Sequence, residues 1–123
     1  MRGRLALLDV LPSTIDATIR RLQELRYLDD RRLAITAAAQ AALRGRGSEY
    51  VRAQLTTKGI AETLIDDSVA AAFHDEAQLA RRVLARRFPR PPQPPAARAK
   101  AARFLLQRGF PEAVVLAILE EGC

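Results

Sequence analysis

The stretch RYLDDRRLA, residues 26–34, contains the adjacent carboxylates Asp29 and Asp30, whose type and spacing could do chemistry. Paired carboxylates can bind a hard metal ion or act as general acid and base. Neighbouring residues of a helix, however, point about 100° apart, so such a pair rarely converges on one ion. No His, Cys or further carboxylate recurs nearby at the spacing of metal ligands. We therefore expect neither catalysis nor metal binding from this pair.

A structural role fits the same residues better. Asp29 is interpreted as the N-cap of a helix, because its side chain can accept from free backbone N–H groups of the first turn. Asp30 then lies in that turn, where the helix dipole favours a negative charge. Leu28 and Leu33 stand at the two positions of a hydrophobic staple, which fixes the direction in which the chain enters a helix.

The remaining reactive side chains do not form a catalytic or metal-binding pattern. His74 is the only histidine and Cys123 the only cysteine, so an internal disulfide and a cysteine-based zinc cluster are excluded. Asp66 and Asp67 are interpreted as a solvated helix face. A single cysteine suits a reducing compartment and favours a cytoplasmic protein. The sequence therefore predicts no enzymatic activity, no metal and no cofactor.

The whole chain has the pattern of a helical protein, because apolar residues recur at helical spacing and no segment alternates as a strand does. No run of eighteen apolar residues is present, so we expect no membrane span. The segment PRPPQPP, 89–95, is expected to be a stiff extended connector. The first expected helix begins at the cap Ser13, a second runs from about Asp30 to Leu43, and a third begins at Ser48. A fourth carries Leu64, Ile65, Val69 and Phe73, and three more cover about Glu76 to Phe88, Ala96 to Gln107 and Pro111 to Glu121.

Two apolar helix faces and one helix end are predicted from local spacing. The first helix carries Ile15, Ile19, Leu22 and Leu25 on one side, and we expect that face to be exposed if its partner helix is missing. The helix from Ser48 should stop at Gly59, a glycine in the C-terminal position. The second helix should turn the following residues inward: Leu33, Ala34, Ala37, Ala38 and Ala41.

An internal repeat connects these elements. RAQLTTKGIAETLIDDSV, 52–69, aligns with ARFLLQRGFPEAVVLAIL, 102–119, at a shift of fifty residues, and LDDRRLA aligns with HDEAQLA, 74–80. In the second of these stretches Asp75 takes the cap position and Gln78 follows as in a capping box. The start of the chain fits a third time, with Asp9 where the other repeats have glycine. The paired turn residues are Lys58 with Arg108, Gly59 with Gly109 and Ile60 with Phe110.

The predicted fold is all-α, with tandem three-helix repeats that form an elongated, curved array. Residues 1–28 are the remnant of a first repeat, 29–74 form a second repeat and 75–123 form a third. Because the first repeat lacks its first helix, we expect the natural protein to extend further, or this chain to be a fragment.

The charge of the chain indicates a class of partner. The net charge is +6 and the sequence pI about 10.6, which favours polyanions or an acidic protein face. Between residues 77 and 110 there are nine basic residues and no acidic one. The alternative interpretation is a solvated face that only aids solubility. The candidate binding face consists of Arg81, Arg82, Arg86, Arg87, Arg98, Lys100 and Arg103.

Taken in order, YLDDRRLA, RGRGSEYVRAQLTTKGI, the basic helix and ARFLLQRGF resemble the RecX family of bacterial regulators. The likeness covers nearly the whole chain, with departures at Leu33, where the family usually has Phe, and at Gln107. The first repeat lacks the turn glycine, and the connector is richer in proline than is usual. The matching positions are Tyr27, Leu28, Asp29, Asp30, Ala34, Gly45, Gly47, Leu55, Lys58, Gly59, Ile60, Phe104, Leu105, Arg108, Gly109 and Phe110.

The resemblance implies a non-enzymatic protein of three-helix repeats that acts in the bacterial cytoplasm, and we expect it to be a monomer. Family members bind the recombinase RecA, lie in the groove of the RecA–DNA filament, and block its extension, ATPase activity and strand exchange. Single- or double-stranded DNA is a further partner to consider.

Two other interpretations remain open. One is a stand-alone basic module that binds DNA, since EYVRAQLTTKGIAETLIDDSV partly resembles a helix-turn-helix with Gly59 at the turn. Its recognition helix would carry Glu62, Asp66 and Asp67, which phosphates repel, so only non-specific, salt-sensitive binding through the arginines is expected. The other is a helical scaffold for an unrelated protein.

Overall fold

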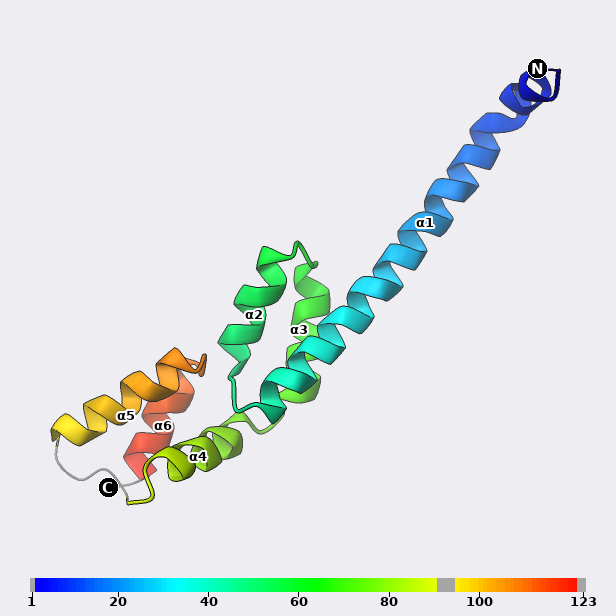
Figure 1. Ribbon diagram of the computed structural model, residues 1–123. Helices are drawn as coiled ribbons and strands as arrows, with labels where there is room; N and C mark the ends of the chain where they lie inside the picture. The colour runs from blue at the N-terminus through cyan, green and yellow to red at the C-terminus, as the bar shows by residue number, and fades with distance from the viewer. Residues whose placement is uncertain (1, 91–94, 122–123) are drawn as a thin grey trace. The chain divides into compact units, whose positions relative to one another are not determined.

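The computed structural model describes residues 2–90 and 95–121, with side chains described for 13–90 and 96–120. Every regular element in these residues is an α-helix, as predicted (Figure 1). The chain divides into two compact units, 1–32 and 33–123. No helix among the described residues has the length and apolar character needed to cross a membrane. The helices are α1 (Arg2–Leu43), α2 (Ser48–Thr57), α3 (Glu62–Ala72), α4 (Glu76–Arg87), α5 (Pro95–Gln107) and α6 (Glu112–Glu121).

The predicted helix starts at Ser13 and Asp29 are wrong. Both residues, and Asp30 with them, lie inside α1, so Asp29 is not an N-cap and Leu28 and Leu33 do not form a staple. An N-cap residue needs a non-helical backbone, and RYLDDRRLA contains no Gly or Pro that would break a helix. An Asp inside a helix costs only about 0.7 kcal/mol relative to Ala, which is too little to interrupt it.

The large apolar side chains between residues 13 and 32 are exposed. Ile15, Ile19, Leu22 and Leu25 are between 41% and 59% exposed, in agreement with the expectation for a face without a partner helix. Arg21 and Glu24 form an exposed ion pair over 3.7 Å in this unit, which contributes little to stability.

The last turns of α1 pack with α2 and α3 around one apolar core. Ala34, Ala38 and Ala41 are buried in this core with Leu55 of α2 and Ile65 of α3, because their small side chains allow close approach between helices. The inward orientation predicted for Leu33 is wrong, since its side chain is 39% exposed.

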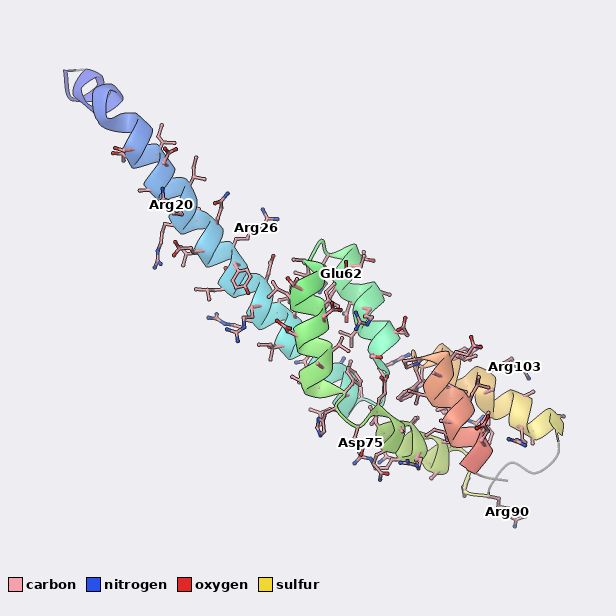
Figure 2. All side chains as sticks on the ribbon, turned by 180° about the vertical axis from the view of Figure 1, so that it is seen from behind. Arg20, Arg26, Glu62, Asp75, Arg90 and Arg103 are labelled. Atoms are coloured by element: carbon pink, nitrogen blue, oxygen red, sulfur yellow. The ribbon has the colours of Figure 1, made fainter. Side chains whose placement is uncertain are left out.

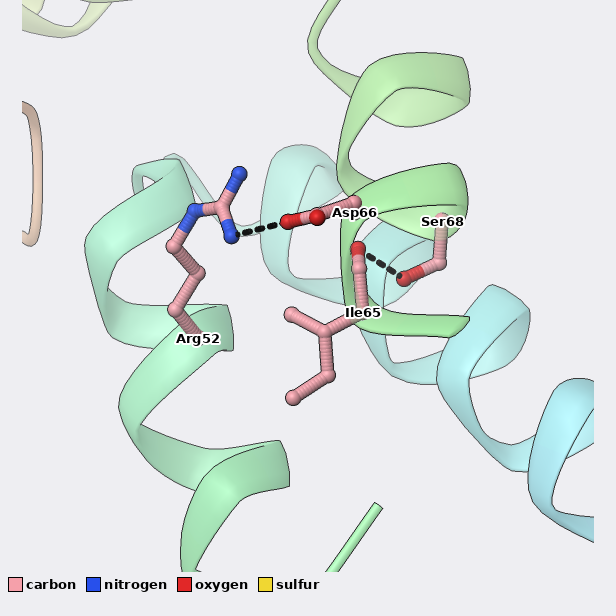
Figure 3. A network of polar contacts seen from close by, with 4 residues as sticks. All are labelled: Arg52, Ile65, Asp66 and Ser68. Atoms are coloured by element: carbon pink, nitrogen blue, oxygen red, sulfur yellow. Dashed lines mark hydrogen bonds and ion pairs between the residues drawn. The ribbon is translucent and has the colours of Figure 1, made fainter. Parts of the chain in front are cut away.

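Polar contacts join α2 and α3 at the surface of this core. Arg52 Nη1 of α2 donates to Asp66 Oδ1 of α3 over 2.6 Å (Figure 3). The hydroxyl of Ser68, which is itself buried, donates to the carbonyl oxygen of Ile65 over 2.9 Å. Asp66 is therefore part of a surface ion pair between two helices, and it belongs to no group of three or more potential metal ligands in the described residues.

Helices α4, α5 and α6 pack around a second core, and the repeat explains its composition. Leu55 and Leu105, fifty residues apart, are both fully buried, each in its own core. Ile65 and Val115 are likewise 4% and 1% exposed. The shift of fifty residues seen in the sequence therefore relates equivalent positions in two three-helix units.

Glycine turns end α2 and α5 in the same way. Gly59 and Gly109 have φ angles of +79° and +95°, which favour glycine because a Cβ is strained there. The N–H of Ile60 donates to the carbonyl of Leu55 over 3.1 Å, and Phe110 N–H makes the corresponding bond of 3.2 Å to Leu105. This pairing is a Schellman motif, so the predicted position of Gly59 at the helix end is confirmed.

One predicted helix start is confirmed and another is wrong. Asp75 caps α4, since its Oδ1 accepts from the N–H of Gln78 over 3.2 Å, and Figure 2 shows it at the start of that helix. For α2 the N-cap residue is Gly47, whereas Ser48 is the first helical residue. The Ser48 hydroxyl instead donates to Glu76, a partner 28 residues away that local sequence patterns cannot indicate.

Candidate functional site

The two three-helix units meet where the loop after α1 contacts the turn after α5. Gly47 N–H donates to the carbonyl of Arg108 over 2.9 Å, and Glu49 N–H donates to that of Gly109 over 2.8 Å. This approach needs glycine on both sides. A Cβ on Gly47 would stand 2.5 Å from the Gly109 carbonyl carbon, and one on Gly109 would stand 2.5 Å from Tyr50 Cβ. We call this contact the junction.

Glu76 adds a charged contact to the junction. Its Oε2 accepts from the backbone N–H of Ser48 over 2.6 Å, and its Oε1 accepts from the Ser48 hydroxyl over 2.8 Å. Ser48 is only 3% exposed, so both of its donors depend on this carboxylate. A carboxylate of α4 thus satisfies the first turn of α2, where the helix dipole also favours a negative charge.

Arg108 joins the junction from the other side. Its Nε donates to the carbonyl of Gly45 over 3.1 Å, and its Nη2 donates to that of Arg44 over 2.6 Å. These carbonyls follow the C-terminal end of α1, where a cation is favourable. The guanidinium also lies 5.9 Å from the ring centroid of Phe104. The Arg108 side chain is therefore held in place by two backbone carbonyls and an aromatic ring of the same protein.

A groove of about 540 Å³ lies beside Arg108, between the end of α1, α4 and α5. We call it the basic groove. Its lining combines cationic and apolar residues, and no carboxylate is among the described residues that line it. The lining consists of Arg44, Arg82, Arg86, Arg87 and Arg108 with Ala42, Leu43, Gly45, Leu79, Val83 and Phe104.

Aromatic contacts position one arginine of the basic groove. Phe88 and Phe104 meet edge to face, with ring centroids 5.8 Å apart and planes at 87°. The Arg87 guanidinium lies 4.9 Å from the Phe88 centroid and 6.0 Å from that of Phe104. Such cation–π contacts hold the guanidinium beside the ring while leaving its N–H donors available to a ligand.

A second hollow, of about 290 Å³, adjoins the junction and shares Arg44 and Arg108 with the basic groove. It adds Arg46 and Lys58, and the Arg46 guanidinium lies 5.1 Å from the centroid of the Tyr50 ring. We call this the second hollow, and we call the two sites together the basic band. The cations of the band are Arg44, Arg46, Lys58, Arg82, Arg86, Arg87 and Arg108.

The structure brings together only part of the face predicted from sequence. Arg82, Arg86 and Arg87 line the basic groove. Arg81 does not, because it lies about 160° around α4 from Val83, and its Nη1 donates to Gln78 Oε1 over 2.7 Å. Three of the four arginines predicted on α4 therefore lie at this groove, and a binding role for Arg81 stays a prediction.

The predicted cations of α5 lie apart from the basic band. Arg98 Nη2 donates to the carbonyl of Leu119 over 2.7 Å, so this side chain stabilises the end of α6. Lys100 and Arg103 are exposed on α5 but line neither the groove nor the second hollow (Figure 2 labels Arg103). Their absence from the lining makes them matched controls for charge reversal.

Sequence reasoning missed Arg44 and Arg46 as site residues and treated Lys58 and Arg108 as parts of a turn motif. The signal was present in RGRGS, where two arginines alternate with the glycines that permit close backbone approach. No group of three or more metal-ligating side chains occurs among the described residues. His74 lies at the surface, with Nδ1 3.4 Å from the carbonyl oxygen of Ala71.

The fold and site define an all-helical protein in which two three-helix units meet at a cation-lined junction. Residues 74–119 match the family description "RecX, third three-helix domain". The chain is 36% identical over 100 residues to the regulatory protein RecX of Cronobacter sakazakii and 33% identical over 122 residues to that of Deinococcus radiodurans. These alignments cover 80% and 98% of this chain, which spans 61% and 58% of the two relatives.

A third relative is aligned over more than two thirds of its length and shows the family of this chain. The regulatory protein RecX of Chromohalobacter salexigens is 31% identical over 110 residues, with 89% of this chain and 72% of the relative aligned. The chain belongs to the RecX family. The resemblance drawn from YLDDRRLA, RGRGSEYVRAQLTTKGI and ARFLLQRGF is thereby confirmed.

Proposed function

We propose that this protein is a non-enzymatic regulator that binds the recombinase RecA and the RecA–DNA filament in the bacterial cytoplasm. It inhibits the ATPase activity of the filament, its extension and strand exchange, and so limits homologous recombination and the SOS response. Membership of the RecX family supports this proposal, as does the name of the relatives, which describes them as regulatory proteins.

The observation that carries the proposal is the basic band. It gathers cations from two three-helix units into neighbouring hollows, and no carboxylate is among the described lining residues. Clustered cations produce a positive potential that attracts a polyanion and orients its approach. A nucleoprotein filament carries the negative phosphates of its DNA, so its charge is opposite to that of the basic band.

The direct test is the ATPase activity of RecA on single-stranded DNA, measured with substoichiometric amounts of the chain. We expect the ATPase rate to fall at low ratios, because a regulator that acts on filament growth affects many RecA subunits at once. If inhibition requires enough protein to saturate the DNA, simple competition for DNA replaces filament regulation as the explanation.

Paired charge reversals show whether the basic band is responsible. Arg82→Glu with Arg86→Glu changes the groove, whereas Lys100→Glu with Arg103→Glu changes exposed cations outside it. Each pair lowers the net charge from +6 to +2, since every reversal removes a positive charge and adds a negative one. We expect inhibition to be lost in the first variant and retained in the second. Equal loss in both would mean that only overall charge matters.

The second candidate function is non-specific DNA binding without an effect on RecA, which the same clustering of cations favours. A duplex-binding assay without RecA, repeated at two salt concentrations, distinguishes the two. Strong, salt-sensitive DNA binding combined with an unchanged RecA ATPase rate would favour this second function.

A further inference from the structure

We propose that the basic groove binds an acidic peptide segment that carries an aliphatic side chain, and that it does not bind nucleic acid. This inference deepens the proposed function, on which it rests, by naming the chemistry of the partner at the same site. It follows from three properties of the groove: its arginine walls, its exposed aliphatic surface and the environment of the aromatic ring among its described lining residues.

The walls favour carboxylates. Arg82 and Arg86 are exposed on α4 and line the groove, and neither forms an ion pair with a side chain that the structure describes. A guanidinium matches a carboxylate through two parallel N–H···O bonds, which gives both strength and orientation. Arg108 has fewer free donors than Arg82 and Arg86, because its Nε and Nη2 already donate to backbone carbonyls of the chain. The groove thus offers several guanidiniums within a single depression.

The aliphatic surface indicates a second requirement. Leu43, at the end of α1, is 87% exposed, and it lines the groove together with Leu79 and Val83. An exposed leucine next to arginines gains free energy when an apolar group covers it, by about 25 cal/mol for each Å² removed from water. A phosphate backbone supplies no such group, whereas a peptide supplies Leu, Ile or Val between its carboxylates.

The aromatic ring argues against nucleobases. Proteins that bind single-stranded nucleic acid stack bases on open aromatic faces. Phe104 is half-buried, meets Phe88 at 5.8 Å, and has the guanidiniums of Arg87 and Arg108 at 6.0 and 5.9 Å from its centroid. Since its surroundings are already occupied, Phe104 supports the arginines and offers no platform for a base.

The size of the groove agrees with a short peptide segment. Its volume of about 540 Å³ lies within the range of roughly 300–1,000 Å³ found for binding sites of small ligands. A few side chains fill such a space. The occupant we commit to is therefore a short acidic segment of a partner protein with one or two aliphatic residues.

The test uses the whole chain and three fluorescent probes of equal net charge. The first is a peptide in which leucines alternate with pairs of glutamates, the second is oligo-glutamate, and the third is oligo-deoxythymidine. Fluorescence anisotropy gives the dissociation constant of each probe. We expect the leucine-containing peptide to bind at least about tenfold more tightly than either control probe, because only it satisfies both charge and apolar burial.

Variants assign the binding to this groove. Leu43→Ala should weaken binding of the leucine-containing peptide and leave oligo-glutamate unchanged, whereas Leu106→Ala, at a residue of α5 that is 46% exposed and outside the groove, should change neither. Because Leu43 is almost fully exposed, its removal does not compromise folding. Arg82→Glu with Arg86→Glu should abolish peptide binding, and Lys100→Glu with Arg103→Glu should preserve it.

Each outcome decides the question. Tighter binding of oligo-deoxythymidine, or equal binding of both peptides, overturns the inference even if RecA inhibition is present. Groove-dependent binding of the leucine-containing peptide supports it even if RecA is unaffected, in which case the proposed function fails and the partner is another acidic protein.

Discussion

A Cβ on Gly47 would stand 2.5 Å from the carbonyl carbon of Gly109, so these two glycines bring the backbones of two three-helix units into direct contact. Hydrogen bonds from Gly47 and Glu49 to the turn after α5 make this contact specific. The junction is therefore defined by backbone geometry, and the side chains of the basic band take their positions from it.

Alanine substitutions at three glycines should separate close contact from backbone strain. Gly59→Ala has no neighbour within 4 Å but requires a φ of +79°, which costs about 1–2 kcal/mol. Gly109→Ala adds a clash with Tyr50 to similar strain, and Gly47→Ala has the clash without the strain, at φ −90°. We expect Gly109→Ala to destabilise most, as measured by urea unfolding. Equal losses at Gly59 and Gly109 would contradict the close contact.

Replacement of Glu76 should loosen the junction. Glu76→Ala leaves the N–H and hydroxyl of Ser48 without an acceptor, and loss of hydrogen bonds to a charged group costs about 1.5–3 kcal/mol. Ser48→Ala removes only the hydroxyl and should cost about 1 kcal/mol. Hydrogen exchange at the first turn of α2 should rise more in Glu76→Ala than in Ser48→Ala. The reverse order would mean that water replaces the carboxylate.

Two aspartates that align in the sequence should respond in opposite directions to alanine. Asp75→Ala removes the cap of α4 and should cost about 0.5–2 kcal/mol. Asp29→Ala lies inside α1 and should be neutral or stabilising by up to about 0.7 kcal/mol, because Ala has the higher helix propensity. Thermal unfolding followed by circular dichroism measures both. Destabilisation by Asp29→Ala would restore the helix start predicted there.

The second hollow should contribute to the proposed regulation of RecA. Arg46→Glu with Lys58→Glu places two negative charges where the second hollow has cations, and leaves the basic groove unchanged. We expect a several-fold higher concentration for half-inhibition of the RecA ATPase, with the Lys100→Glu, Arg103→Glu variant as the control of equal charge. Unchanged inhibition would restrict the functional surface to the groove.

Short-range patterns were sufficient for most of the fold. Gly59 and Asp75 act on backbone groups within a few residues, so their positions at helix ends could be predicted from neighbouring sequence. The helix starts predicted at Ser13 and Asp29 were wrong for a physical reason. A residue with a capping side chain starts a helix only if the preceding chain leaves the helix, and nothing in the sequence forces it to do so there.

The sequence predicted that the candidate site is rich in arginine, but it did not predict all of the residues that line the site. The excess of arginine in α4 identified Arg82 and Arg86, which line the groove. Arg44 also lines the groove, and its carbonyl oxygen accepts from Arg108, 64 residues later. Contacts at such separation depend on the packing of whole units, which a single sequence does not reveal.

Arg44 and Arg108 line both the basic groove and the second hollow, so the two depressions have a common wall. We therefore expect a ligand in one site to weaken the binding of an anionic ligand in the other. A carboxylate bound to a shared guanidinium in one site partly neutralises its charge, and so weakens the binding of an anion in the other site. Thermodynamic linkage requires this effect on binding free energy to be equal in both directions. A single partner that spans the junction needs only one anion at the shared cations, so we expect the molecule to bind one long ligand more tightly than two short ones.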